Sequence, residues 1–525
     1  MAKVRVWGVQ LPTDKSGEDA VRRAAARAVG VRPEAVLGWN VVRRSLDARK
    51  QRRKPMWVYV LDLDLDGRPG RAAAGVRLEK PPERAGAARP PSTALSGRRA
   101  LVVGSGPAGL FGALALLDRG AQVELLEQGP PLEERVAAVG GLWRAGVLSP
   151  DANVQFGEGG AGTFSDGKLT TRIRAPQVRE VLEKFVEAGA PETILEESHP
   201  HLGTDGVRKI VRTLRGQLES RGARFTFRTR AERVERAGPG YRLVAGGRGI
   251  EADILLLATG HSSRALSRAL MAMGVPFRAK GFAVGVRVEH PQAWVDERQY
   301  GAAEGSGLPP AEYFLTYKDG ETGRGVYSFC MCPGGVVVNS ASEPETLVTN
   351  GMSMSHRASG FANAGIVVTV GPPDFGADPL EGLRLQERLE REGYRLGGGG
   401  YAAPAQQISA FLEGVEGPQV GRCTFRPRVR TVSLRGFFPD WIEGPLARGL
   451  RDFERKLPGF AEKGILLAPE TRTSSPMQVV RSADGCPAGF PGLLVVGEGA
   501  GWSGGITSSA ADALRCVGAF CASLE

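Results

Sequence analysis

The chain has 525 residues, of which 42% are hydrophobic and 24% charged, and Gly (73) and Pro (35) make up about a fifth of it. These values are typical of a globular protein with several domains, and they exclude a chain that is disordered throughout, a collagen-like fibre and a coiled coil. The net charge of +11 arises in the N-terminal fifth, because positions 1–98 hold 21 basic and 10 acidic residues and the remainder holds 47 of each.

No run of about 18 apolar residues occurs, and the first residues alternate like a strand rather than forming the apolar core of a signal peptide. The six Cys show neither a CxxC pair nor a Cys/His cluster with zinc spacing. We therefore expect a cytoplasmic protein without a membrane span, a disulfide framework or a bound metal.

The first 78 residues predict a small β-α-β-β domain, with strands at Val4–Val9, Val36–Arg43 and Trp57–Leu65 and a helix at Gly17–Val29. Residues 79–98 are rich in Pro and nearly free of large apolar side chains, which indicates a linker.

The loop between the last two strands of this domain is strongly basic, with Arg43, Arg44, Arg49, Lys50, Arg52, Arg53 and Lys54. Such a hairpin is an electrostatic footprint for polyanions. No aromatic residue is interleaved from Val41 to Met56, so the stacking surface of a single-strand RNA site is missing. We favour a solvated loop, or one docked on an acidic face of the rest of the chain, over a nucleic-acid site.

From Ala100 a buried strand, a Gly-rich turn, an apolar helix and a second buried strand predict a βαβ unit with a dinucleotide fingerprint. Gly104 permits the tight turn, Gly106 lets the backbone approach a pyrophosphate, and Gly109 lets helix and strand pack closely. Glu127, at the end of the second strand, is placed to accept from both ribose hydroxyls. The expected contacts of this unit are Gly104, Ser105, Gly106, Pro107, Ala108, Gly109, Glu127, Gln128 and, on the adenine or pyrophosphate side, Arg135, whose alternative is an ordinary helix-surface position.

Two later segments return to the same sheet: DILLLATG at Asp253–Gly260, and the strand, Gly-rich turn and helix of Gly492–Leu514. With these three motifs in order, the chain resembles the glutathione-reductase-type flavoproteins, which implies FAD rather than NAD as the resident dinucleotide. The resemblance implies that Glu498 binds the ribityl or pyrophosphate region and that the helix starting near Gly505 points at the flavin. The expected contacts here are Ala231, Thr259, Gly260, Gly497, Glu498, Gly505 and Ile506.

A closer resemblance is carried by NVQFGEGGAGTFSDGKLTTR (153–172), HLGTDGVRKIVRTLR (201–215), FCMCPGG (329–335) and NGMSMSHR (350–357). These segments are similar to a family of bacterial FAD-dependent dehydrogenases that are mostly uncharacterised. The resemblance implies FAD and a two-domain flavoprotein body, and it implies no particular substrate.

Within EGGAGTFSDGK, the glycines, among them Gly160 and Gly162, allow close approach to a flavin ring, to which Thr163 or Ser165 can donate. Lys168 is a candidate catalytic residue, because a cation near flavin N1 and C2=O stabilises the reduced flavin. Its alternatives are a solvated lysine or a phosphate contact.

His201 is a candidate for moving a proton near pH 7. Its phrase HLGTD opens a helix, however, where Thr204 or Asp205 is a natural cap, so a structural role is favoured. His261 and His356 are further candidates, which the sequence does not rank.

Cys330 and Cys332 flank Met331 on a predicted strand. Residues i and i+2 of a strand share a face, yet their separation strains an intramolecular bridge. We therefore expect two buried small side chains, and redox-active thiols are the alternative.

The sequence thus predicts an α/β protein: a doubly wound FAD-binding domain (99–273 and 478–525), an inserted β-rich substrate domain (274–477) and the small basic N-terminal domain. The expected function is an FAD-dependent oxidoreductase that moves a hydride between flavin N5 and a small organic substrate. No second GxGxxG follows a strand, so NAD(P)H is at most a transient visitor. The alternative is a nucleic-acid-directed flavoprotein of the tRNA-modifying type that docks RNA with its basic domain.

Overall fold

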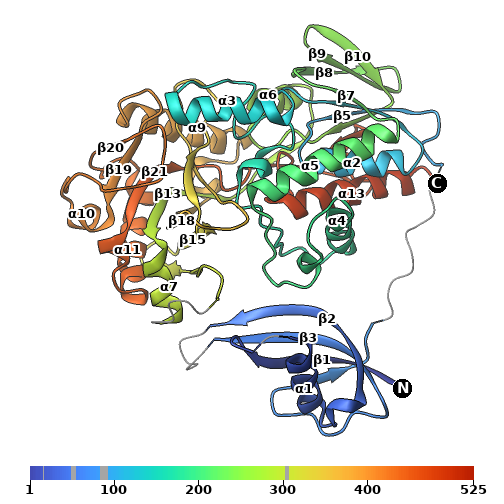
Figure 1. Cartoon of the computed structure of the whole chain (residues 1–525). Helices are drawn as coiled ribbons and strands as arrows, with labels where there is room; N and C mark the ends of the chain where they lie inside the picture. Colours follow the sequence, from blue (N-terminus) through green and yellow to red (C-terminus); the bar gives the residue numbers. More distant parts are fainter. Residues whose placement is uncertain (16, 49–54, 83–92, 302–306) are drawn as a thin grey trace.

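The computed structural model describes residues 1–15, 17–48, 55–82, 93–301 and 307–525 (Figure 1). It confirms the α/β fold: three main sheets follow one another along the chain, each with helices packed on it. None of the described helices is long and apolar enough to span a membrane.

The N-terminal unit is a four-stranded antiparallel sheet in the order β2-β3-β1-β4, covered on one face by α1 (Glu18–Val29). Its strands are β1 (Ala2–Pro12), β2 (Val36–Asp47), β3 (Met56–Leu65) and β4 (Arg77–Glu79). The first three agree with the predicted strands. β4 was missed because only three residues pair with β1, at the point where the sequence becomes linker-like.

The N-terminal unit lies beside the main body, below it in Figure 1, and contacts it through β2. The Arg44 N–H donates to Glu196 O (2.6 Å) and the Ser198 N–H donates to Arg44 O (2.9 Å). The Arg44 guanidinium also lies 3.0 Å from Glu197 and over the Trp57 ring. Two of the predicted basic residues, Arg43 and Arg44, thus dock on the main body. Arg49, Lys50 and Arg52–Lys54 lie outside the described residues, and a nucleic-acid partner stays a prediction.

We expect Arg44→Ala to lower the free energy of unfolding by less than about 1 kcal/mol, because both partners of the ion pair are a third exposed. Ser198→Pro should cost more, about 1–3 kcal/mol, since it removes both the backbone and the hydroxyl donor to Arg44 O. Urea unfolding of the two variants checks this order. A larger effect of Arg44→Ala would show that the ion pair, rather than the backbone pairing, holds the unit.

The second sheet is parallel, in the order β23-β11-β5-β6-β7. Its strands are β5 (Arg99–Val103), β6 (Gln122–Leu126), β7 (Arg224–Thr226), β11 (Ile254–Leu257) and β23 (Leu493–Val495). They are short runs and, apart from the edge strand β7, are largely buried, as is typical of parallel strands. The predicted returns of 253–260 and 492–514 to this sheet are therefore confirmed.

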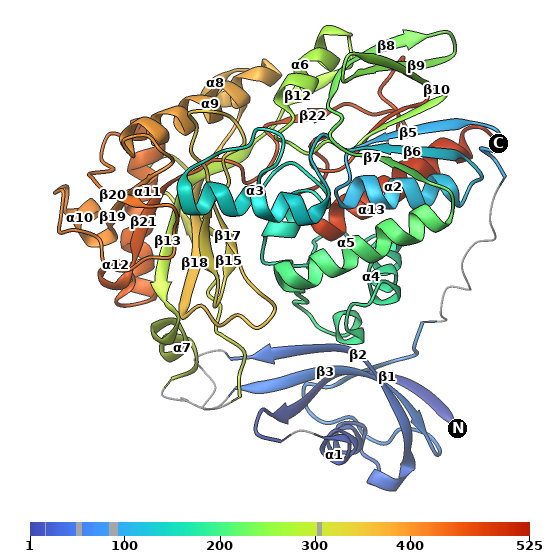
Figure 2. The same cartoon turned by 45° about the horizontal axis from the view of Figure 1, so that its top comes forward.

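Helices cover one face of the parallel sheet: α2 (Pro107–Leu117), α5 (Gly203–Ser220) and α13 (Ile506–Ala522), with α4 (Pro176–Glu187) outside them (Figure 2). The other face is covered mainly by a three-stranded sheet and α6 (Arg264–Ala272) rather than by a second helical layer. That sheet consists of β8 (Ala231–Ala237), β9 (Gly240–Ala245) and β10 (Arg248–Ala252). α3 (Leu132–Ala145) follows β6.

The third sheet has seven strands in the order β14-β15-β18-β13-β21-β19-β20 and is antiparallel except at β19/β20. Its strands are β13 (Phe282–Pro291), β14 (Thr316–Lys318), β15 (Gly325–Cys332), β18 (Phe361–Val370), β19 (Ala403–Gln407), β20 (Val429–Thr431) and β21 (Ile465–Glu470). Two-stranded ladders join β12 (Phe277–Ala279) to β22 (Met477–Val479) and β16 (Val336–Asn339) to β17 (Thr349–Met352).

This third region is less purely β than its sequence indicates. The sequence pattern predicts one helix in this region, around Leu380 to Glu392, which agrees with α9 (Pro379–Leu396), whereas α11 (Asp440–Lys456) was missed. Shorter helices are α7 (Gln292–Tyr300), α8 (Pro372–Phe375), α10 (Ile408–Glu413) and α12 (Phe460–Lys463).

Candidate functional site

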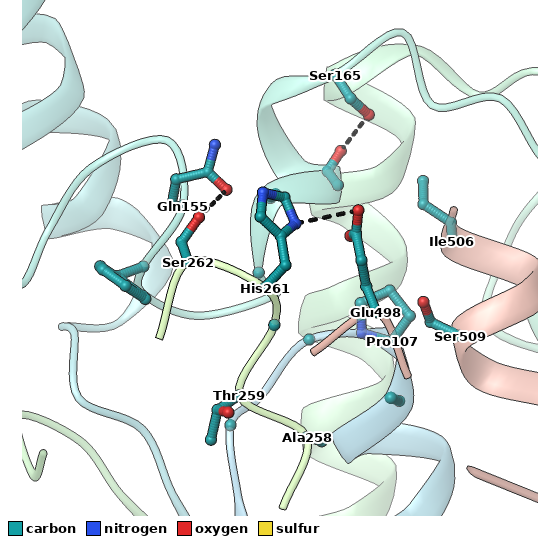
Figure 3. Close-up of a pocket in the computed structure, with 18 of the residues that line it drawn as sticks. Pro107, Gln155, Ser165, Ala258, Thr259, His261, Ser262, Glu498, Ile506 and Ser509 are labelled. Carbon is teal, nitrogen blue, oxygen red and sulfur yellow. Dashed lines mark hydrogen bonds and ion pairs between the residues drawn. The ribbon is translucent and has the colours of Figure 1, made fainter. Parts of the chain in front are cut away.

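A cavity of about 380 Å³ opens where the parallel sheet meets the third sheet. Three segments that follow the carboxyl ends of parallel strands line it: 103–108, 258–263 and parts of 496–509. Phe329, Cys330 and Asn350 of the third region line it as well. Figure 3 shows His261, Glu498 and Ile506 around its centre. Ligand sites of open α/β sheets form at this end of the strands.

The glycine-rich turn is shaped by contacts that leave no room for side chains at two of its three glycines. Gly104 has φ +101°, and a Cβ there would lie 2.5 Å from Ala258 O. A Cβ on Gly109 would lie 1.8 Å from Gly104 O. Gly106 differs, because its backbone (φ −72°) suits any residue and a Cβ would meet Gly160 Cα at an ordinary 3.6 Å. Only a ligand would therefore require glycine at position 106.

Two helices begin at this cavity without a side-chain cap from any described residue: α2 after Gly106 and α13 after Gly505. The first N–H groups of a helix carry partial positive charge and bind anions. Nothing lies within 4 Å of a Cβ built on Gly260 or Gly504. We call the open backbone at Gly260 and Gly504 the glycine cradle. Together with the two helix ends, it fits the pyrophosphate and flavin of FAD.

Glu127 is buried, and its carboxylate is used by the protein itself. One oxygen accepts from the N–H (3.0 Å) and hydroxyl (2.7 Å) of Ser105, and the other accepts from Gly129 N–H (3.0 Å) and Gly157 N–H (3.1 Å). Glu127 lines the cavity, but it also holds the glycine-rich turn against the 157 loop, and a ribose hydroxyl would share these acceptors.

Arg135 does not line the cavity, so its expected contact with the cofactor is wrong in this structure. Its guanidinium is fully buried, and its three nitrogens donate to the carbonyls of Asn153, Val154, Gly157, Glu158 and Gly160 and to the Thr163 hydroxyl. Burial lowers the pKa of Arg135 to about 9. Arg135 instead fixes the path of residues 153–163.

Thr163 is likewise drawn inward, because its hydroxyl accepts from Arg135 and donates to Gly160 O. It does not line the cavity, in contrast to the expectation that it donates to the cofactor. Ser165 does line the cavity.

Most of the other predicted cofactor residues line the cavity: Gly104, Ser105, Gly106, Pro107, Ala108, Gln128, Gly160, Gly162, Ala231, Thr259, Gly260, Glu498, Gly505 and Ile506. Gly109 lies behind the turn, at the contact between helix and strand. Gly497 also lies behind it, where its N–H donates to buried Asp512 (2.8 Å) and turns the chain at φ +77°.

Lys168 lines the cavity and donates from Nζ to Met331 O. Burial alone would lower its pKa, but the negative charges of Glu312, Cys332, Cys330 and Asp166 outweigh burial, so the pKa of Lys168 is raised. Lys168 is therefore a half-buried, charged ammonium at neutral pH.

His201 pairs with Lys168 through the backbone but does not line the cavity. Burial, followed by the positive charge of Arg357, lowers its pKa, so the ring is neutral at pH 7. The expected cap at this helix is wrong. Thr204 donates to Thr163 O and Asp205 accepts from Ser355, and neither caps α5.

His261 is the histidine that lines the cavity within the described part of the chain. Its Nδ1 lies 3.1 Å from Glu498 Oε1 (Figure 3), and its buried Nε2 has no described protein partner. His356 is not among the lining residues.

Sequence reasoning missed Arg472, which lines the cavity and joins the two larger parts of the chain. Together with Arg264 it encloses the buried Glu390 carboxylate, at 2.8–3.0 Å, and it donates to Ser262 (2.9 Å). Burial alone would raise the pKa of Glu390. The positive charges of Arg472 and Arg264 outweigh burial and hold this pKa well below its usual range. No local pattern in TRTSS signals this role.

Comparisons with known proteins agree with the geometry. Family models match residues 99–192 ("FAD binding domain"), 281–473 ("FAD-dependent protein, C-terminal domain-like") and 5–64 ("Domain of unknown function (DUF8436)"). An uncharacterised protein of Clostridium beijerinckii is 41% identical over 423 residues, which are 79% of each chain.

Solved structures resemble the chain only distantly. A flavoprotein/dehydrogenase from Cytophaga hutchinsonii is 11% identical with a TM-score of 0.36, covering 81% of this chain and 78% of its own. A geranylgeranyl bacteriochlorophyll reductase-like protein from Thermoplasma acidophilum is 14% identical with a TM-score of 0.35, covering 82% and 79%. Likenesses at this level carry no inference about the reaction.

Proposed function

The chain belongs to the same family as the uncharacterised Clostridium beijerinckii protein and is an FAD-dependent oxidoreductase, and from that premise we propose that it transfers a hydride between flavin N5 and a small organic substrate. In this proposal residues 99–273 and 478–525 bind FAD, and residues 274–477 provide the substrate side of the cavity.

One observation carries the proposal: a single cavity joins the glycine cradle and two uncapped helix ends to a polar wall from the third region. The cradle supports binding of the cofactor. The wall includes Cys330 and Asn350, which lie where a substrate can be held beside the cofactor.

Bound FAD supplies two-electron chemistry by accepting or releasing a hydride. Lys168 keeps a positive charge in the cavity, which stabilises negative charge that develops there. His261 is the best placed group to hold or move a proton, because it lines the cavity, Glu498 pairs with its Nδ1, and its Nε2 has no partner among the described residues. In this scheme either the substrate itself reduces the flavin or NAD(P)H visits transiently to do so.

We expect Lys168→Met to retain FAD and to slow flavin reduction about tenfold, equal to about 1.4 kcal/mol. The loss is modest because Glu312 and Asp166 already offset much of the ammonium charge. Stopped-flow reduction measures it, with Lys184→Met on the exposed face of α4 as the matched control. An unchanged rate would place Lys168 outside the reaction.

The proposed function is tested by anaerobic mixing of the FAD-loaded protein with NADH, NADPH and a panel of small metabolites. At least one of these should bleach the visible flavin band. If only dithionite bleaches the band, the proposed hydride transfer from a small organic donor is contradicted, whereas FAD binding is not.

A further inference from the structure

Cys330 and Cys332 lie at the cavity on a distorted stretch of β15. β15 pairs with β18 at Phe329↔Gly365 and then at Cys332↔Asn363, so one extra residue is bulged out of the ladder. Cys330 adopts φ +44°, which non-glycine residues rarely do. The bulge removes the regular strand geometry that would hold two such thiols apart.

The two cysteines differ in access. Cys330 is partly exposed and lines the cavity, whereas Cys332 is fully buried behind it. The Cys332 thiol donates to the backbone carbonyl of Cys330 (3.4 Å), which folds the two residues together at the bulge. Cys330 therefore faces the cavity, and Cys332 lies directly behind it in the same short stretch of chain.

Two cations flank the pair: Arg287, which is buried, and Lys168, which is half-buried. Arg287 on β13 is fully buried and donates to Cys330 O (3.2 Å) and Phe329 O (3.4 Å). Arg287 Nη2 and Cys332 Sγ both lie against Gly351. A Cβ at this glycine would be 2.5 Å from Arg287 Nη2 and 2.8 Å from Cys332 Sγ. Lys168 donates to the carbonyl between the two cysteines, that of Met331.

These surroundings shift the pKa values of the two thiols in opposite directions. A side-chain hydrogen bond from Cys332 lowers the pKa of Cys330 to about 6. Burial and the negative charge of Asp166 oppose this lowering, whereas the positive charges of Lys168 and Arg287 add to it. The pKa of Cys332 is raised, first by this hydrogen bond and then by burial. Of the two thiols, Cys330 is therefore the one that loses its proton first. Burial instead raises the pKa of the other four cysteines, Cys423, Cys486, Cys516 and Cys521.

We propose that Cys330 and Cys332 form a thiol–disulfide exchange site that takes a small disulfide into the cavity, with Cys330 as the attacking sulfur and Cys332 as the resolving one. The Cys330 thiolate attacks one sulfur of R–S–S–R, and R–S⁻ leaves with the electron pair of the broken bond. Cys332 then gives its proton to the first R–S⁻, its sulfur attacks the Cys330 sulfur, and the second R–S⁻ leaves and takes a proton from water. The two protein thiols are oxidised to one disulfide, and the small disulfide is reduced to two thiols.

The site goes beyond the proposed hydride transfer and needs no bound FAD for its test. The fully reduced, full-length protein is incubated anaerobically with glutathione disulfide at pH 7 and analysed by intact mass and peptide mapping. The wild type should lose two hydrogen masses and two free thiols, both in the peptide that holds Cys330 and Cys332. Cys332→Ser should trap one glutathione on Cys330, and Cys423→Ser, which removes the other partly exposed cysteine, should behave as the wild type.

Alkylation of the wild type by iodoacetamide gives a second measurement that requires no substituted variant. The rate at Cys330 should level off above pH 6 to 7, whereas the rate at Cys423 should still rise at pH 9. The proposal is overturned if all six thiols persist at every ratio of oxidised to reduced glutathione, or if the Cys332→Ser adduct lies on another cysteine. Either outcome would leave FAD binding and flavin reduction unaffected as separate findings.

Discussion

Gly106→Ala should weaken FAD binding by about 100-fold or more, equal to about 2.8 kcal/mol, while leaving the apoprotein folded. The added methyl group meets only Gly160 Cα, at 3.6 Å, and the backbone at φ −72° accepts alanine. The methyl group would occupy the space through which the turn approaches a pyrophosphate. The substitution therefore lowers the affinity for FAD and leaves the stability of the apoprotein unchanged.

Two measurements separate these effects: a fluorescence titration with FAD, and the Tm of the cofactor-free protein, which should stay within about 2 °C of the wild type. Gly216→Ala is the matched control, because it is an exposed helical glycine with nothing within 4 Å of its Cβ. It should leave FAD affinity unchanged and stabilise α5 by about 0.5–1 kcal/mol. Undiminished FAD affinity of Gly106→Ala would mean that the pyrophosphate does not approach the turn at this residue.

Arg135→Met should lower the free energy of unfolding by about 3–5 kcal/mol and disorder the loop that lines the cavity. The substitution removes the side-chain donor to the buried carbonyls of Asn153, Val154 and Glu158, and one of the donors to those of Gly157 and Gly160. Buried acceptors without partners are costly, and methionine fills the volume without replacing a single hydrogen bond.

Urea unfolding of Arg135→Met measures this loss. Arg212→Ala is the control, because Arg212 is half exposed, pairs with exposed Glu133 and should contribute less than about 0.5 kcal/mol. If both substitutions cost equally little, the carbonyls of residues 153–160 must find other partners and Arg135 does not organise the loop.

The parallel sheet and its cradle were predictable because they follow from local signals. Buried β-branched runs that end in glycine-rich turns are enough to place Gly104, Gly260 and Gly505 at one edge of a parallel sheet. The sequence does not indicate α11 because Gly444, Pro445 and Gly449 lower helix propensity. Gly449 lies where this helix packs on Val326.

Features that depend on distant segments were not predictable. Arg135 has the sequence context of a helix-surface residue, and its burial arises because residues 153–163 wrap over it. The bulge at Cys330 likewise depends on the register between β15 and β18, which no alternation in FCMC encodes. Arg472 finds Glu390 and Arg264 only after the third region folds back on the parallel sheet.

The central claim is that the glycine cradle and the two helix ends bind the dinucleotide of FAD. Parallel titrations of the apoprotein with FAD and with FMN, which lacks the pyrophosphate bridge and the adenosine, test it most directly. We expect one FAD per chain and binding of FMN weaker by about 100-fold, since FMN cannot span both helix ends. Equal affinity for the two flavins, or no binding of FAD, would contradict the account.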